Sequence, residues 1–377
     1  MENKIIKLPF CVKRPVLALG AQTKNTLCFA HGDSAFLSPV HNDLDDPVDL
    51  SGFERRARHF LKRSPRVVAA DLHPEYSSSR FVALCPGSYK LAAIQHHHAH
   101  IASCMVDNGL KNQKVIGVAF DGTGLGNDGT FWGAEFFICD YKDFVRFACV
   151  KPVPLPAGEK AIREPWRLTA AWLDAAYGEK FLELDLEFTR NLNKKKWRVL
   201  KKMQECGFNS PLSNSAGRLF DAAACLITRE KQAHFEAELA IKLEKLAGKF
   251  AFEKNMARCY NFTVSKDGMC SVIDPRPIFK GIVRDLIDKE HKERIAYRFH
   301  ATVAGMISAI CLKARRKTGL NKIILSGGVF QNRIIADKSL GLLSKEGFRV
   351  FMHKKISCND SGISLGQMAV GNFREGR

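Results

Sequence analysis

Four histidines lie close together in residues 95–100, which read Gln-His-His-His-Ala-His. If this segment is helical, His96 and His100 stand one turn apart on one face, and their rings can share one metal ion. The alternative is an ordinary mixture of surface and packing histidines. A carboxylate in a glycine-rich turn about twenty residues later favours the metal site, because imidazole and carboxylate groups are common ligands of the same ions.

That carboxylate, Asp121, ends a strand-like run and begins the glycine-rich turn of residues 121–126, Asp-Gly-Thr-Gly-Leu-Gly. Ligands bind where strands end in open α/β sheets, and glycines let backbone N–H groups approach an anion closely. Gly122, Thr123 and Gly124 are therefore candidate nucleotide contacts, and Asp121 can reach a metal ion. An ordinary hairpin is the alternative, because residues 127–130 (Asn-Asp-Gly-Thr) are common turn residues.

A second glycine turn contains Gly327, Gly328 and Asn332, between a predicted strand and a predicted helix. Small residues there admit an adenosine or its phosphates, and the Asn332 amide offers both a donor and an acceptor. A tight strand-to-helix connection accounts equally well for this pattern.

Two further aspartates begin predicted helices. Asp360 is either the N-cap of the last helix or a fourth metal ligand, and two histidines with two aspartates suit Fe(II), Zn(II) or Mn(II). Gly217 and Asp221 open an apolar helical run, where Asp221 can hold ribose hydroxyls or can simply be an acid favoured by the helix dipole.

The elements that must position these residues occur twice in one order. Three strands, a helix, two strands and the histidine helix are followed by a second set of strands that begins at residue 115. This repeat predicts an α/β fold of two ribonuclease-H-like lobes with a central cleft, rather than one doubly wound sheet. We place the first lobe at residues 1–113 and the second at 114–377, with a helical insertion at about 160–295.

Composition is that of a globular protein, with 46% hydrophobic and 26% charged residues among 377. No secretory signal is visible, and no apolar run is expected to reach the ~18–20 residues of a membrane span. The twelve cysteines include no CxxC pair, so zinc ribbons and a disulfide framework are disfavoured and a reducing cytoplasm is expected.

The chain is strongly basic, with 58 Lys and Arg against 39 Asp and Glu, a net charge of +19. Such a charge suits an anionic partner: a nucleotide, a nucleic acid or an acidic protein. The densest basic block, residues 194–202, is more typical of a solvated helix face than of a nucleic-acid footprint. No Ser-His-Asp order or Walker loop is present.

Further motifs accompany these: residues 14–21 (Arg-Pro-Val-Leu-Ala-Leu-Gly-Ala), 24–26 (Lys-Asn-Thr), 71–76 (Asp-Leu-His-Pro-Glu-Tyr), 163–167 (Arg-Glu-Pro-Trp-Arg), 209–212 (Asn-Ser-Pro-Leu), 215–221 (Ser-Ala-Gly-Arg-Leu-Phe-Asp) and 325–332 (Leu-Ser-Gly-Gly-Val-Phe-Gln-Asn). With the histidine cluster and residues 121–124 and 359–367, they run nearly end to end. The set resembles the C-terminal, TsaD-like domain of the HypF carbamoyltransferase family, in the actin-like ATPase superfamily.

The resemblance implies two actin-like lobes and a metal ion, Fe or Zn favoured, held by His96, His100, Asp121 and Asp360. It also implies an ATP-derived adenylate site. The residues expected there are Asp221, Gly327, Gly328 and Asn332, beside the first glycine turn and Gly217.

The implied reaction moves a carbamoyl group from carbamoyl-adenylate to the C-terminal cysteine thiol of a HypE-like partner, where it becomes the precursor of the cyanide ligands of [NiFe]-hydrogenase. Whole HypF proteins carry an acylphosphatase domain, zinc modules and a YrdC-like domain before this one. We therefore expect such an adenylate-forming component to act in trans.

Transfer to a hydroxyl group or to tRNA adenosine is the alternative reaction, with tRNA disfavoured. A non-catalytic nucleotide-binding scaffold is a third hypothesis. It is motivated by Ala134 and Ala237, which add methyl groups where the family tends to have glycine; Ser361 replaces a third glycine.

Overall fold

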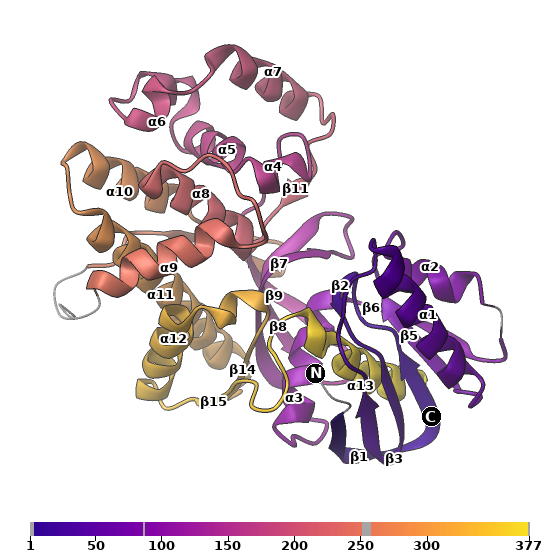
Figure 1. Cartoon of the computed structure of the whole chain (residues 1–377). Helices are drawn as coiled ribbons and strands as arrows, with labels where there is room; N and C mark the ends of the chain where they lie inside the picture. The colour runs from indigo at the N-terminus through magenta and orange to yellow at the C-terminus, as the bar shows by residue number, and fades with distance from the viewer. Residues whose placement is uncertain (1–3, 86, 251–257, 376–377) are drawn as a thin grey trace.

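A computed structural model describes residues 4–85, 87–250 and 258–375, and it has two α/β lobes, each built on its own sheet (Figure 1). The first sheet has the strand order β3-β1-β5-β6, with β3 antiparallel to β1 and the other two parallel to it. Its strands are β1 (Lys4–Ala18), β3 (Cys28–Leu37), β5 (Val67–Asp71) and β6 (Lys90–Ile94).

Strand alternation gives this sheet two separate cores. Leu17 of β1 and Leu19, directly after the strand, face the core under α1 (Pro47–Leu61) and α2 (Ser77–Ala83). Val16 and Ala18 face the opposite core, which α3 (His96–Asp107) and α13 (Ile363–Glu375) cover. A two-stranded ribbon of β2 (Thr23–Asn25) and β4 (His41–Asp43) completes the lobe.

The second sheet has the order β12-β13-β9-β8-β7-β14-β15. Parallel pairing of β14 with β7 sets Ser326 opposite Ala119, so the loops that follow these two strands lie at the same edge. Its strands are β7 (Val115–Leu125), β8 (Phe131–Cys139), β9 (Phe144–Val150), β12 (Thr263–Asp267), β13 (Cys270–Asp274), β14 (Lys322–Ser326) and β15 (Arg349–Phe351), with β10 (Val153–Pro154) and β11 (Leu212–Ser213) at its side.

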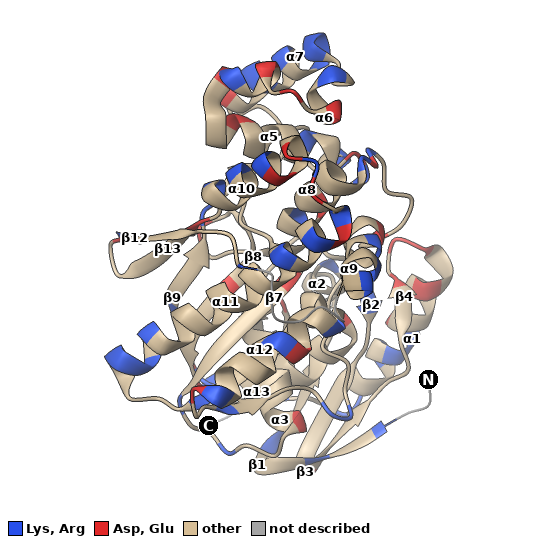
Figure 2. Ribbon diagram, turned by 90° about the vertical axis from the view of Figure 1, so that its left-hand side faces the viewer, with Lys and Arg blue, Asp and Glu red and all other residues tan. Residues whose placement is uncertain are grey.

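Helices form most of the segment predicted as an insertion, of which residues 251–257 lie outside the described part (Figure 1). Within it, the basic block forms α7, which is marked by its Lys and Arg colouring in Figure 2. Trp197 and Leu200 of α7 are buried, whereas most of its lysines are exposed. The helices are α4 (Lys160–Arg163), α5 (Trp166–Tyr177), α6 (Glu187–Arg190), α7 (Lys194–Glu205), α8 (Ala216–Thr228), α9 (Glu238–Phe250), α10 (Arg276–Ile287) and α11 (Lys292–Thr318), and α12 (Arg333–Lys345) follows later.

One helix departs from the expectation about apolar runs. Among the described residues, α11 has the length and apolar composition that could cross a membrane, so the prediction that no run approaches that length was wrong. In the structure 78% of that apolar window is buried inside the protein, as in the core helix of a globular domain.

The end of the chain returns to the first lobe. The predicted division at residues 113 and 114 falls between α3 and β7, but α13 packs against β1, β5 and α3. Leu365, Met368 and Val370 of α13 belong to the same core as Val16. The Gln367 side chain also accepts a hydrogen bond from the N–H of Gly20, at 2.8 Å.

Glycines permit the close packing around α3. A Cβ atom built on Gly366 of α13 would lie 1.8 Å from the carbonyl oxygen of Ala99, and one on Gly117 of β7 would lie 2.9 Å from the Ile101 side chain. Every residue of α3 from His96 to Val106 is buried as a result.

Replacing Gly366 by alanine should therefore destabilise the protein by about 3 kcal/mol or more, because backbone atoms of α3 and α13 must separate. The measurement is urea unfolding followed by circular dichroism. Gly341→Ala in α12 is the matched control: nothing lies within 4 Å of its added Cβ, so a gain of roughly 0.5–1 kcal/mol is expected. Equal stability of the two variants would contradict the packing described above.

Candidate metal centre

Four side chains from three segments meet at one point between the lobes. His96 and His100 come from the first turns of α3, Asp121 from β7, and Asp360 from the start of the short 3₁₀ helix η3 (Asp360–Gly362). One potential ligand atom from each lies within 4.8 Å of all the others. The structure thus brings together the four residues that were predicted as ligands.

The two histidines present their Nε2 atoms to both carboxylates. His96 Nε2 is 3.3 Å from Asp121 Oδ2, and His100 Nε2 is 3.6 Å from Asp360 Oδ1. Both nitrogen atoms are buried and have no hydrogen-bond partner among the described residues. Unsatisfied buried nitrogens are costly, and a metal ion at this point would satisfy both and bind the two carboxylate oxygens. The donor set therefore fits a divalent ion.

Asp71 orients His96 and was not predicted as a site residue. Its Oδ2 lies 2.8 Å from His96 Nδ1, while its Oδ1 accepts the backbone N–H of His73 at 3.0 Å. A carboxylate behind a histidine keeps the proton on Nδ1 and directs the lone pair of Nε2 outward, as behind many metal-bound histidines. Asp71 ends β5, and this strand-end position was its available signal. Asp121 was predicted to end its strand, but β7 continues to Leu125 and only its pairing with β8 is interrupted between Phe120 and Gly124.

Asp121 is fixed by the second glycine turn. Its Oδ1 accepts the N–H of Gly328 at 2.7 Å, which leaves Oδ2 directed at the histidines. Gly327 has φ +105°, and a Cβ on it would lie 2.2 Å from the carbonyl oxygen of Phe120. Glycine is therefore required there so that the turn can approach β7.

The carboxylates control the charge of the histidines. Burial alone would lower the pKa of His96 and His100, but Asp71 and Asp121 acting on His96, and Asp121 acting on His100, raise both pKa values. Burial would raise the pKa of Asp121, yet the two imidazolium rings lower it well below its usual value. Without a metal ion, these shifts favour protonated imidazoles at His96 and His100 and an ionised carboxylate at Asp121.

The other two histidines of the cluster point elsewhere. His97 Nδ1 is 3.1 Å from the Gln95 amide, and His98 Nε2 is 2.6 Å from the carbonyl oxygen of Asp140. Burial lowers the pKa of both, that of His98 to about 4. A Cβ on Gly124 would lie 2.6 Å from the His97 ring, so this glycine makes room for the cluster.

The predicted nucleotide residues lie around the same cleft edge. A Cβ on Gly217 of α8 would be 3.0 Å from the Cα of Gly122, whereas nothing lies within 4 Å of a Cβ on Gly122. The Thr123 hydroxyl donates to the carbonyl of Gly122 at 2.6 Å. Contact with nucleotide by these residues remains a prediction.

Asp221 and Asn332 already have protein partners. Asp221 is buried, accepts a hydrogen bond from Arg218 Nε at 2.8 Å and forms an ion pair with Arg218 Nη2 at 2.8 Å, and burial raises its pKa despite that pairing. Asn332 is the N-cap of α12, where its Oδ1 accepts the N–H of Ile335, and its Nδ2 lies 3.0 Å from His300 Nε2. Asp221 is thus not the exposed first-turn acid of the alternative interpretation.

Lys24 is a cleft residue for which the sequence predicted no role in the site. Its ammonium group forms an ion pair with Glu236, which joins β2 of the first lobe to the loop before α9. Burial would lower the pKa of Lys24, but Glu236 and then Asp360 and Asp121 raise it. A cation therefore stands within the field of the metal-centre carboxylates.

The departures from the family pattern have different structural settings. Ala134 is fully buried in the core of the second lobe. The carbonyl oxygen of Ser361 accepts a hydrogen bond from the Thr26 hydroxyl of the first lobe, at 2.9 Å. Ala237 is exposed with φ +60°, a backbone conformation that favours glycine.

Known proteins match the chain over most of its length. Residues 117–367 match the family described as carbamoyltransferase, Kae1-like domain, second subdomain, and residues 12–107 match the HypF Kae1-like domain. A carbamoyltransferase HypF homolog of Cupriavidus necator is 34% identical, with 94% of this chain and 90% of that protein aligned. Carbamoyltransferase HypF of Rhodobacter capsulatus is also 34% identical, but this chain covers 46% of its length.

A solved structure of a HypF protein is also similar to this chain. The crystal structure of full-length HypF in its phosphate- and nucleotide-bound form superposes with a TM-score of 0.90 at 36% identity, covering 98% of this chain and 47% of that one. The match confirms the predicted α/β fold of two actin-like lobes.

Metal uptake should release protons, because a metal ion needs the unprotonated Nε2 atoms whose pKa values the carboxylates raise. Apparent Zn²⁺ affinity should therefore increase as pH rises through those raised pKa values, by about tenfold per pH unit for each proton displaced. Titration calorimetry in buffers of different ionisation enthalpy measures the release. Asp71→Asn should weaken binding by roughly 10–100-fold, while exposed Glu75→Gln should not. An affinity that is independent of pH would contradict the assigned protonation.

Ala237→Gly should stabilise the protein by roughly 0.5–1 kcal/mol, because glycine adopts a positive φ without the steric strain of a Cβ atom. Thermal unfolding measures the change. Ala240→Gly, in the first turn of α9, should instead cost up to about 1 kcal/mol. A loss of stability in both variants would show that Ala237 is not strained.

Proposed function

The chain belongs to the HypF family of carbamoyltransferases, and on that premise we propose that it transfers a carbamoyl group from carbamoyl-adenylate to an acceptor bound at the cleft between its lobes. The observation that carries the proposal is the pair of unpartnered imidazole nitrogens facing two carboxylates at that cleft. The acceptor we propose is the C-terminal cysteine thiol of a HypE-like protein, which leads to the cyanide ligands of [NiFe]-hydrogenase.

We propose that His96, His100, Asp121 and Asp360 hold a divalent metal ion, with iron or zinc favoured by the mixed nitrogen and oxygen donors. When bound, the ion would supply Lewis acidity to a phosphate or carbonyl oxygen. Asp360 has the most exposed side chain of the four, 19% against 0–7% for the others, so ligand would approach from its side.

The surrounding residues hold this geometry. Asp71 fixes the ring of His96, and the N–H of Gly328 fixes the carboxylate of Asp121. In our proposal the first glycine turn, together with Gly217, accepts the adenylate. Lys24 then balances the phosphate charge by exchanging its partner Glu236 for the ligand.

No nucleophile of this chain is required, because AMP leaves directly when the acceptor thiol attacks the carbamoyl carbon. Cys358, whose carbonyl oxygen accepts the N–H of Gly327, supports this view. Burial, followed by the negative charge of Asp121, raises its pKa to about 11, so it is a protonated thiol near neutral pH and a poor nucleophile.

The carbamoyl-adenylate would come from another protein component. The chain spans about half the length of several relatives, although it spans 90% of the Cupriavidus necator HypF homolog. We propose that a YrdC-like component, with its acylphosphatase partner, makes the adenylate in trans from carbamoyl phosphate and ATP.

The test supplies carbamoyl-adenylate and a HypE-like acceptor to the purified protein and measures thiocarbamate on the acceptor by mass spectrometry. Wild type should transfer one carbamoyl group, while His100→Ala and Asp121→Asn should reduce the rate at least about 100-fold. His31→Ala, at an exposed histidine of β3, is the matched control and should keep the rate.

The alternatives are tested in the same assay with a hydroxyl acceptor and with tRNA. Modification of either one in place of the thiol would replace the proposed acceptor. No transfer to any acceptor by metal-loaded wild type would support the scaffold hypothesis instead.

A further inference from the structure

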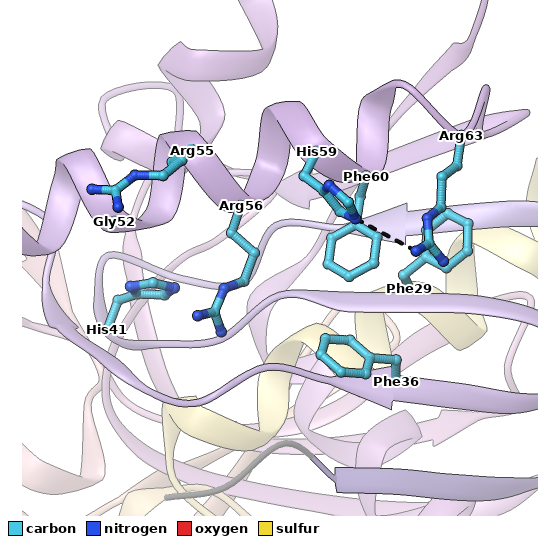
Figure 3. Close-up of a pocket in the computed structure, with 9 residues that line it drawn as sticks. All are labelled: Phe29, Phe36, His41, Gly52, Arg55, Arg56, His59, Phe60 and Arg63. Carbon is cyan, nitrogen blue, oxygen red and sulfur yellow. Dashed lines mark hydrogen bonds between the residues drawn. The ribbon is translucent and has the colours of Figure 1, made fainter.

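A second cavity lies in the first lobe, on the opposite face of the sheet from the metal centre. It has a volume of about 630 Å³ and opens between α1 and β3, the edge strand of the first sheet (Figure 3). α1 packs on the core that contains Leu17 and Leu19, whereas α3 packs on the other core. The β-sheet itself therefore separates this cavity from the cleft.

One half of the cavity is cationic. Arg55 and Arg56 of α1 lie beside His41 of β4 (Figure 3). In the described part of the chain neither arginine has a carboxylate partner within 4 Å, and the ion pair on the same helix joins Arg58 to Glu54. Unpaired arginines beside one another repel, so this half is favourable to an anion.

Two polar atoms in that half lack partners. The Nη1 atom of Arg56 and the Nε2 atom of His41 are both buried without a hydrogen bond among the described residues. The His41 residue is 8% exposed. Burial, and then the charge of Arg56, lower its pKa. Buried polar atoms of this kind are normally satisfied. An anionic oxygen would satisfy Arg56 Nη1, and also His41 Nε2 in the tautomer that carries the ring proton there.

The other half is aromatic. Phe29 and Phe60 are stacked with ring centroids 5.0 Å apart, and Phe36 lies 5.3 Å from Phe60 (Figure 3). Arg63 lies over the Phe29 and Phe60 rings at 5.7 and 5.5 Å, contacts His59 and also lines the cavity. Such a surface binds a planar apolar group.

Gly52 keeps the cavity open. It lies inside α1, where glycine costs a helix about 1 kcal/mol relative to alanine. A Cβ there would already be 3.4 Å from His41 Nδ1. A larger side chain would therefore extend over the imidazole and occupy the cationic half.

From these features we infer that the α1–β3 cavity is a binding site for a small organic anion with an aromatic body, such as an aryl phosphate. The anionic group would lie against Arg55, Arg56 and His41, and the ring against the three phenylalanines. The site does not depend on carbamoyl transfer.

The probe is 4-fluorophenyl phosphate, whose binding to the whole protein is measured by fluorine NMR. Wild type should bind it more tightly than either inorganic phosphate or 4-fluorophenol, because each of these has only one of the two groups. Arg56→Met should weaken binding about tenfold or more, since it removes charge and keeps the length of the side chain. Arg58→Met, on the same helix but paired with Glu54, should leave binding unchanged.

Gly52→Leu is a second, independent test, in case Arg56→Met loses binding only because it misfolds. It should abolish binding while the melting temperature stays equal or rises, because leucine favours the helix. Equal binding by Arg56→Met and Arg58→Met would overturn the inference. Loss of binding in His96→Ala but not in Arg56→Met would also overturn it, because the probe would then occupy the cleft.

Discussion

The close approach of α13 to α3 is the constraint on which the rest of the structure depends. α3 has no exposed side from His96 to Val106, and this is tolerated because glycines of β7 and α13 face it. A helix packed so tightly cannot rotate or slide without moving both sheets. The positions of His96 and His100 are therefore set by the packing of backbone against backbone, before any ligand contributes.

Burial of this helix also sets its electrostatics. Two imidazoles and three carboxylates share a small, largely buried volume, and His96, His100 and Asp121 depend on their charged neighbours for their own charge states. Gly328 N–H binds Asp121 Oδ1, and Asp71 binds His96 Nδ1, so these hydrogen bonds use atoms that point away from the centre. Asp121 Oδ2 and His96 Nε2 are left directed at the centre. This arrangement is preorganised: the donors face one point at the expense of their own hydrogen bonding. In a family of carbamoyltransferases, such a centre at the cleft is where ligand chemistry would take place.

Local sequence was enough to predict the metal ligands that belong to one segment, but not the contacts between distant segments. Helical spacing selected His96 and His100, and the strand-end position selected Asp121, because both are properties of a single segment. Asp71 was overlooked because its value lies in a contact with His96 that exists only when β5 is placed beside α3. The ion pair of Lys24 with Glu236 joins residues 212 positions apart, and no local pattern encodes such a contact. The two-lobe order was readable from the repeated elements, but the return of α13 to the first sheet was not, since an amphipathic helix does not specify which sheet it covers.

The packing of α13, from the end of the described chain, on the first sheet has a consequence for biosynthesis. During synthesis the first sheet emerges from the ribosome well before the helix that covers one of its faces, because Leu365, Met368 and Val370 of α13 are made long after Val16. Until then the face bearing Val16 and Ala18 lacks the cover that α13 supplies, and domain-by-domain folding from the N-terminus is not available to this lobe. Its folding must wait until α13 has been made, with the long loop closure and slow rate that such distant contacts impose. A nascent chain of this protein is therefore a natural client for chaperones that shield apolar strands.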